Sequence, residues 1–262
     1  MPEGDTIHRS AATLKRVLEG QVVRAARTVV PGVDAASLVG LRVTAVEARG
    51  KHLVVVFEDG RALRTHMRMT GSWHVYRMGE AWGKPERLAR IVLETDGWVV
   101  PCFNAPEVEL LPPGRVERSD RLGRLGPDIV AEAFDADEAL ARLRTRGDAT
   151  IGEALLAQGV VAGIGNIYKS ETLFLAGVSP FTRVAALDDA ALAVILRIAR
   201  ELMRSNLGTA TRTTRSALDG GRYWVYRRSG APCRKCATLM RMRRQGLGGR
   251  SSYWCPSCQP EG

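Results

Sequence analysis

The chain has 262 residues, of which 45% are hydrophobic, so it is long enough for two domains or one large one and can bury a substantial core. Its 38 Lys and Arg against 28 Asp and Glu give a net charge of +10, which favours a polyanionic partner, although a GC-rich genome also favours arginine codons. No apolar stretch approaches the length of about 18 residues that spans a membrane, and the charged N-terminus is unlike a signal peptide, so we expect a cytoplasmic protein.

The chain opens with MPEGDTIHR, which places a proline directly behind the initiator methionine. Most N-termini tolerate change, but Pro2 becomes a secondary amine, and therefore a nucleophile, once Met1 is removed. Behind it, apolar residues recur at the spacing of one helix face, and Gly20 supplies a stop. The residues of this face are Ile7, Ala11, Leu14 and Leu18.

From residue 21 to about residue 111 the pattern changes to short β-rich runs, such as HLVVVFEDG and ARIVLETDGWVV. Turn signals such as EDG and TDG separate the runs, which predicts antiparallel strands in a sandwich or barrel. The segment LPPGR at 111–115 then breaks the chain. We therefore place the first domain at 1–115.

Beyond this break the sequence becomes helical, at 135–146, 150–158, 165–177 and 187–208. Gly177 and Gly208 follow apolar periodic runs at positions expected for helix stops. The pattern predicts a helical domain at 116–220, followed by a small module at 221–262.

The small module holds four of the five cysteines, in the spacing C-x2-C-x18-C-x2-C: Cys233, Cys236, Cys255 and Cys258. In a cytosolic chain this spacing predicts one structural Zn²⁺, held by two knuckles with a β-hairpin between them. The module is also strongly basic, with eight arginines and Lys235 against one acid, Glu261. Cys102 stands apart in an apolar run and is expected to be a small buried hydrophobe.

Three further stretches have both a structural and a functional interpretation. In GIGNIYK, Asn166 stands where a helix begins, so its amide and the backbone N–H groups can bind phosphate, or Gly163 and Gly165 can serve only close packing. In RGKHL, Lys51 is either a solvated hairpin charge or a functional cation. In HMRMTGS, Met69 is either core filler or a wedge inserted between bases.

Together, and in this order, these stretches resemble the formamidopyrimidine-DNA glycosylase and endonuclease VIII family along essentially the whole chain. The resemblance is carried by MPEGDTIHR, RGKHL, HMRMTGS, GIGNIYKSETLFLAG and GGRSSYWCPSCQ. It implies an α+β multidomain fold: an N-terminal β-sandwich with a leading helix, a helix-two-turns-helix domain and a C-terminal β-hairpin zinc finger. Among family members, the opening PEGDT is most similar to the actinobacterial endonuclease VIII-like branch.

The resemblance also implies a function, that of a bifunctional DNA glycosylase and AP lyase of base-excision repair. In this family the mature N-terminal proline, here Pro2, forms a Schiff base with the damaged nucleotide, and β,δ-elimination follows. Glu3 is then the acid and base, and Lys51 binds phosphate near the lesion. Asn166 and Arg250 match residues that grip the phosphates flanking the extruded nucleotide.

Lesion specificity is where the chain departs from the formamidopyrimidine branch. Met69 matches a void-filling position, and a residue of the 103–109 segment, which we expect to be a loop, is the alternative for that role. This segment reads FNAPEVE where formamidopyrimidine enzymes carry an Arg-Arg-Phe stretch, so we expect oxidised pyrimidines rather than 8-oxoguanine as substrates. Thr6 stands where endonuclease VIII proteins often have glutamate.

The alternatives are an 8-oxoguanine- or formamidopyrimidine-specific glycosylase and a non-catalytic paralogue that binds damaged DNA. The paralogue predicts loss of Pro2 or Glu3, and both are present. A small tautomerase with an N-terminal proline would need neither a zinc finger nor a basic C-terminal arm. The expected partner is damaged DNA, bound by a monomer in the bacterial cytoplasm.

Overall fold

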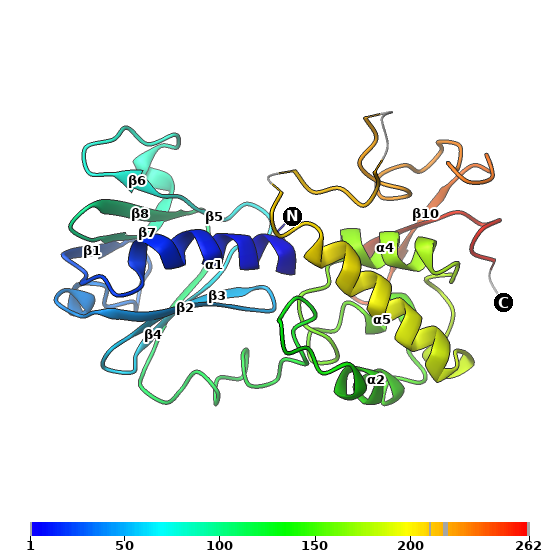
Figure 1. Ribbon diagram of the computed structural model, residues 1–262, viewed down its shortest axis with the longest axis horizontal. Helices are drawn as coiled ribbons and strands as arrows, with labels where there is room; N and C mark the ends of the chain where they lie inside the picture. The colour runs from blue at the N-terminus through cyan, green and yellow to red at the C-terminus, as the bar shows by residue number, and fades with distance from the viewer. Residues whose placement is uncertain (1, 210, 217–219, 261–262) are drawn as a thin grey trace. The chain divides into compact units, whose positions relative to one another are not determined.

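The computed structural model describes residues 2–209, 211–216 and 220–260 (Figure 1). The chain divides into two compact units, Met1–Arg124 and Leu125–Gly262. Among the described residues, every helix is too short or too polar to cross a membrane.

The first unit consists of helix α1, Gly4–Leu18, and two antiparallel sheets. The four-stranded sheet has the order β2-β3-β4-β9, with bounds Val43–Arg49, His52–Phe57, Ala62–His66 and Glu107–Leu111. The second sheet has the order β1-β7-β8-β5, with β6 also paired to β8, and its bounds are Ala25–Thr28, Ala89–Glu94, Trp98–Phe103, Ser72–Trp73 and Tyr76–Arg77. Two sheets and a leading helix confirm the predicted sandwich. Short 3-10 helices lie at Ala36–Leu38 and Glu86–Leu88.

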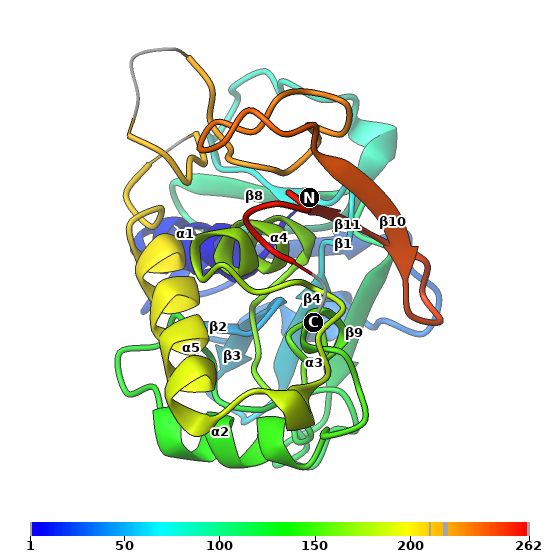
Figure 2. The same ribbon diagram turned by 90° about the vertical axis from the view of Figure 1, so that its right-hand side faces the viewer.

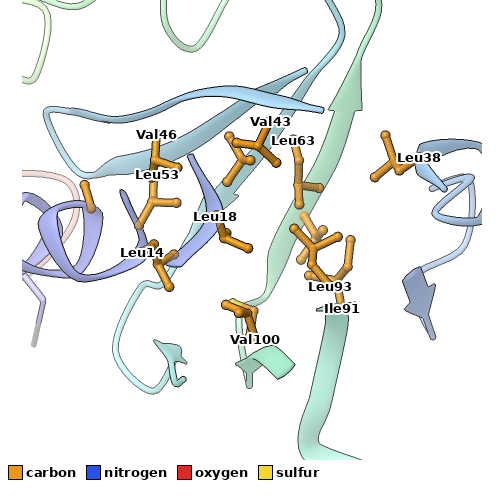
Figure 3. Close-up of a cluster of buried hydrophobic side chains, with 14 of the residues drawn as sticks. Leu14, Leu18, Leu38, Val43, Val46, Leu53, Leu63, Ile91, Leu93 and Val100 are labelled. Atoms are coloured by element: carbon orange, nitrogen blue, oxygen red, sulfur yellow. The ribbon is translucent and has the colours of Figure 1, made fainter. Parts of the chain in front are cut away.

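The core of this unit lies where α1 and the two sheets meet (Figure 3). The predicted apolar face of α1 is buried there, and Leu14 and Leu18 pack with Leu53 of the first sheet and Val100 of the second. Gly20 has a φ of +80°, which glycine adopts without the penalty that a Cβ atom brings, so the predicted stop is confirmed. Burial of this face is what attaches the N-terminus to the sheets.

The second unit contains the helices and the C-terminal strand pair (Figure 2). The helices are α2, α3, α4 and α5, with bounds Ala136–Arg144, Ile151–Ala154, Asn166–Leu175 and Asp189–Arg204, and a 3-10 helix lies at Val184–Ala186. The strands are β10, Arg241–Gln245, and β11, Arg250–Trp254, which pair antiparallel as the predicted hairpin. Strand β11 packs against α4.

Two helix limits differ from the sequence-based expectation. The 150–158 segment forms only the single turn of α3, closed at its start by a capping box between Thr150 and Glu153. Helix α5 ends at Arg204 rather than near Gly208. The Asn206 side chain explains the early end, because its amide donates to Leu202 O and Thr213 O and so turns the chain away.

Candidate functional site

Helix α1 holds the N-terminal residues in place through backbone hydrogen bonds. The Glu3 carbonyl accepts hydrogen bonds from Thr6 N at 2.9 Å and from Ile7 N at 3.1 Å, so Glu3 is the first residue held by the helix. Its side chain is 0% exposed, and Asp5 is also buried. Thr6 donates from Oγ1 to Asp5 Oδ1 at 3.3 Å. Pro2 is half-buried and directly precedes this buried carboxylate pair.

Lys51 lies at the tip of the β2–β3 hairpin. Arg49 pairs with His52, so Gly50 and Lys51 form a two-residue turn, and Gly50 at a φ of +59° takes the first central position. Lys51 is electrostatically close to His66 at the end of β4. Burial, together with the charges of Arg68 and Lys51, lowers the pKa of His66 to about 4 against the opposing effect of Glu107.

Next to this turn lies a buried arginine, Arg64, whose side chain is 2% exposed. Its Nη1 is 2.9 Å from His52 Nδ1. Because a guanidinium only donates, Nδ1 must accept, and His52 is neutral with its proton on Nε2. Burial and the neighbouring charges of His66 and Arg64 lower the pKa of His52 to about 3, which agrees with this assignment.

The two methionines of HMRMTGS differ in burial. Met67 is buried and packs in the core, whereas Met69 is 59% exposed in the turn that follows β4. The core-filler interpretation therefore applies to Met67 and not to Met69. The 103–109 segment was expected to be a loop, and that expectation is wrong. Phe103 ends β8 and Glu107 begins β9, so only residues 104–106 connect the strands.

The sheet register brings Lys51 and Met69 to one end of the first unit. His52 pairs with His66, and His66 pairs with Glu107, so the β2–β3 turn, the end of β4 and the start of β9 lie side by side. Figure 1 shows the start of α1 pointing to the same end as the tip of this hairpin. The predicted residues Pro2, Glu3, Lys51 and Met69 thus share one end of the unit.

In the second unit, Asn166 is the first residue of α4, as predicted, and Gly165 is its N-cap. The Asn166 Nδ2 atom donates to Ser251 O at 2.7 Å, which ties the start of the helix to the residue next to Arg250. Arg250 is exposed at the start of β11. The structure therefore joins the side chain of Asn166 to the strand that carries Arg250.

The two glycines before Asn166 differ in backbone conformation. Gly163 has a φ of +100°, which only glycine tolerates well, and its N–H donates to Gln158 Oε1 at 3.1 Å. Gly165 is extended, as an N-cap residue should be. Backbone geometry thus explains Gly163, and the start of the helix explains Gly165.

The four cysteines of the C-terminal module form one cluster, with all their sulfur atoms within 4.8 Å of one another. The Sγ atom of Cys236 lies 3.5 Å from that of Cys255 and 3.4 Å from that of Cys258. The knuckle amides of Lys235 and Cys258 donate to Sγ atoms, each at 3.4 Å. Tetrahedral Zn²⁺ at about 2.3 Å from each sulfur needs S–S separations near about 3.8 Å, so this donor set fits a zinc ion. Cys102 is buried elsewhere, and burial raises the pKa of its thiol.

Comparison with known proteins identifies this arrangement. Residues 1–107 match the formamidopyrimidine-DNA glycosylase N-terminal domain, and residues 125–217 match the formamidopyrimidine-DNA glycosylase H2TH domain. A Streptomyces coelicolor protein named probable endonuclease 8 2 is 38% identical, over 99% of this chain and 94% of its own. The chain belongs to the formamidopyrimidine-DNA glycosylase family. The predicted resemblance is thereby confirmed.

Other members of the family agree in length and fold. The Mycolicibacterium smegmatis protein named DNA-(apurinic or apyrimidinic site) lyase Nei2 is 37% identical, and the alignment covers 99% of each chain. The crystal structure of the Thermus thermophilus MutM (Fpg) protein superimposes with a TM-score of 0.81 at 29% identity, covering 100% of both chains. A Lactococcus lactis Fpg mutant bound to Fapy-dG-containing DNA has the same fold, with a TM-score of 0.82 at 23% identity over 99% of this chain and 100% of that one.

Within the family fold, sequence reasoning missed two charged residues of α4. Glu171 is fully buried and accepts from the backbone N–H groups of Trp224, Val225 and Tyr226 at 2.8–2.9 Å, and also from the Thr214 hydroxyl. This carboxylate holds the segment that leads into the zinc-finger module. The sequence did contain a signal for these residues, because a charged residue is uncommon in a helix that is buried on every side.

Lys169 is the second of these residues and is also fully buried. Its Nζ donates to Ser252 Oγ at 2.6 Å and to Ser251 O at 3.2 Å. Ser252 in turn donates to Gln245 Oε1 at 2.5 Å, and so α4 is joined to both strands of the hairpin. Lys169 thereby fixes the strand that carries Arg250.

Proposed function

We propose that the protein is a bifunctional DNA glycosylase and AP lyase of base-excision repair, which removes oxidised bases from damaged DNA. The observation that carries the proposal is the buried Glu3 carboxylate, held at the start of α1 directly behind Pro2 in a chain of this family. Removal of Met1 makes Pro2 the secondary amine that such a site requires. An α-amino group titrates near about 7.7–8.0, so a useful fraction is neutral at cellular pH.

The reaction follows from this amine. Its lone pair forms a bond to C1′ of the damaged nucleotide while the bond from C1′ to the base breaks, and the base leaves with a proton. Opening of the sugar ring gives an iminium ion, which acidifies the C2′ proton. Loss of that proton expels the 3′ phosphate, and a second elimination expels the 5′ phosphate. Water then hydrolyses the iminium and frees Pro2.

Glu3 is the proton donor and acceptor of this sequence. One peptide unit tethers its carboxylate beside the amine, so its proximity costs no additional ordering. Burial removes competing water from the carboxylate. The sugar oxygen receives a proton during ring opening, and the amine loses one during attack.

Each unit carries its own residues for binding phosphate. Lys51 at the hairpin tip is the cation of the first unit, and Asn166 and Arg250 are the donors of the second. Arg250 supplies the planar fork that pairs with phosphate oxygens. These contacts position the DNA and carry no sequence information by themselves.

The target base leaves the stack, and Met69 fills the space that it vacates. Extrusion costs a few kcal/mol, which a damaged base lowers. An exposed thioether at a turn suits an apolar wedge. Oxidised pyrimidines are the favoured lesions because the 103–109 segment reads FNAPEVE and lacks the Arg-Arg-Phe probe of the formamidopyrimidine branch.

One structural Zn²⁺ bound by the four cysteines would hold the hairpin that delivers Arg250. The functional parts are a catalytic domain at 1–115, a DNA-binding domain at 116–220 and a zinc finger at 221–262. We expect a monomer, because extruding one base uses one active site. Its relatives are bacterial, and we place it in the cytoplasm, where it acts on chromosomal DNA.

The test is borohydride trapping, which reduces the iminium to a stable covalent adduct. The substrates are duplexes with thymine glycol, 8-oxoguanine opposite cytosine, or an abasic site. The variants are Pro2→Ala and Glu3→Gln, with Glu19→Gln at the far end of α1 as the matched control. We expect adducts on thymine glycol and on the abasic site, none with Pro2→Ala, and a loss of base release of about 10²-fold or more with Glu3→Gln.

Other outcomes of the trapping experiment would change the proposed function. Preferential trapping on 8-oxoguanine would reverse the assignment of lesion class. Adducts that persist in Pro2→Ala would remove Pro2 as the nucleophile. DNA binding without any adduct on any of the substrates would favour the non-catalytic paralogue.

A further inference from the structure

The turn that carries Met69 is closed by its own backbone. Gly71 N donates to Met67 O at 2.8 Å. A Cβ atom at Gly71 would lie only 2.6 Å from that oxygen, so the closure admits no side chain there. Met67 is buried in the core at one end of the turn, and Met69 is exposed in the middle. The conformation of this turn therefore decides where the Met69 thioether points.

Arg68, directly before Met69, holds a strained conformation. Its φ is +46°, in the left-handed region that costs a residue with a Cβ atom about 1 kcal/mol or more. Such strain persists only where surrounding contacts offset it. The Arg68 backbone N donates to His66 Nδ1 at 3.2 Å, and the guanidinium donates to Glu107 Oε1 from Nε at 2.8 Å and from Nη2 at 2.6 Å.

Glu107 is itself held rigidly. It begins β9, is paired with His66, and its side chain is only 16% exposed. Its second oxygen, Oε2, accepts from Arg64 at 3.4 Å and also from Arg121. Although burial alone would raise it, the pKa of Glu107 lies below its usual range because of the Arg68 hydrogen bonds and the charges of His66 and Arg121.

We propose that Glu107 is a positioning residue for duplex DNA, which holds Arg68 in its left-handed conformation and so keeps Met69 in place to fill the gap left by an extruded base. The inference rests on the proposed role of Met69. Glu107 touches neither substrate nor the reacting atoms and acts through the turn. It stands in the segment where the formamidopyrimidine branch carries its Arg-Arg-Phe stretch, and here it begins strand β9, which pairs with β4, the strand directly before the turn.

A neighbouring carboxylate provides the control. Glu109 is two residues further along β9, and its Oε2 accepts from Arg64 Nε at 3.0 Å. Its side chain is 46% exposed and bonds to Arg64, whereas the guanidinium of Arg68 bonds to Glu107. Glu109→Gln therefore perturbs the same buried arginine without releasing the turn.

The experiment compares single-turnover base release from a thymine glycol duplex with release from the same lesion in a single strand. A single strand leaves no gap opposite a partner base, so it does not need the wedge. The variants are Glu107→Gln, Glu109→Gln, Met69→Ala and the double variant Glu107→Gln/Met69→Ala. We expect Glu107→Gln to slow the duplex reaction about tenfold and the single-strand reaction less than about twofold, since a turn worth about 1.4 kcal/mol corresponds to tenfold in rate.

Glu109→Gln is expected to change neither rate, and the double variant to be no slower on duplex than Met69→Ala alone. Equal slowing on both substrates, or additive losses in the double variant, would overturn the proposal. If Met69→Ala slows the duplex reaction while Glu107→Gln does not, the positioning role alone is wrong. If Met69→Ala changes neither rate, the void-filling role of Met69 and the positioning role of Glu107 are both wrong.

Two further variants separate positioning from a loss of stability. Arg68→Ala keeps the strain of the positive φ and removes the guanidinium, so we expect it to slow the duplex reaction as Glu107→Gln does. Arg68→Gly relieves the strain, so it should preserve the melting temperature and lose less duplex activity than Arg68→Ala. Full duplex activity in Arg68→Ala would show that the contact between the guanidinium and the carboxylate does not hold the turn, and would overturn the proposal.

Discussion

Both units bury charged side chains, but the two burials differ in kind. In the first unit, Glu107 is held by Arg68 and Arg121, whose own side chains are more than half exposed. In the second unit, Glu171 and Lys169 are fully buried, and Glu171 is satisfied largely by backbone N–H groups. The partners of Glu107 are arginine side chains, one of them on the turn of Met69, whereas those of Glu171 are largely backbone N–H groups of one folded segment. The kind of partner thus separates a carboxylate that positions a surface turn from one that holds the scaffold.

Metal removal is expected to have the largest effect, and it tests the structural role of the zinc finger in the second unit. Structural zinc contributes about 10–16 kcal/mol of apparent binding free energy, so chelation or Cys255→Ser should unfold the hairpin and abolish DNA binding. Zinc content per chain, circular dichroism and DNA affinity measure the effect. Cys102→Ala, which changes a buried cysteine outside the cluster, should retain one zinc. Unchanged DNA affinity after zinc release would contradict the role assigned to the finger.

Glu171→Gln tests whether this fully buried carboxylate is structural. Glutamine places an N–H₂ group where backbone donors point, so buried donors lose their acceptor, and we expect a loss on the order of 3 kcal/mol of unfolding free energy. Glu201→Gln, at an exposed ion pair with Arg197, should cost under about 0.5 kcal/mol. Denaturant unfolding compares the two. Similar small losses in both would erase the distinction between the units.

Acid should weaken the first unit through His52. Its pKa is about 3 in the folded protein, against 6.5 as the ordinary value, so the unfolded chain binds the proton first. Stability that is fully present above pH 6.5 is therefore lost as the pH falls, by on the order of 2 kcal/mol between pH 7 and pH 5. His52→Asn keeps an acceptor for Arg64 and cannot titrate, so its stability should be flatter over this range. An unchanged slope in His52→Asn would assign the acid sensitivity to other groups.

Lys169→Met should have the smallest effect of the four. Methionine keeps the unbranched shape of the side chain without its terminal ammonium and cannot donate, but Ser251 O retains Asn166 and Ser252 Oγ retains Gln245. Removal of a buried charge also recovers desolvation energy, so we expect a cost of about 1 kcal/mol. The sharper readout is a several-fold weaker affinity for abasic-site duplex, because β11 carries Arg250. A loss of stability as large as that of Glu171→Gln would mean that Lys169 is part of the scaffold core.

The elements that the sequence predicted well are those with local signals. The apolar face of α1 is read from helical spacing, the start of α4 from the glycines before Asn166, and the finger from cysteine spacing. The wrong expectation concerned the 103–109 segment, because Glu107–Leu111 becomes a strand only by pairing with β4, some 40 residues earlier in the chain. Helix α3 was expected to be longer for a related reason, since tertiary contacts override a local helical pattern.

The sequence by itself determined the family, the order of the sheet, helix and cysteine modules, and the identity of Pro2, Glu3 and the four cysteines as candidates. These follow from short-range patterns, in which the chemistry and the spacing are both visible in the letters. Only the tertiary structure decided that Met69 is exposed while Met67 is buried, that Arg64 and Lys169 are buried cations, and that Glu107 supports the turn of Arg68. Those facts depend on burial and on pairing between distant strands, and the free energy of a charge is set by the groups that the fold places around it.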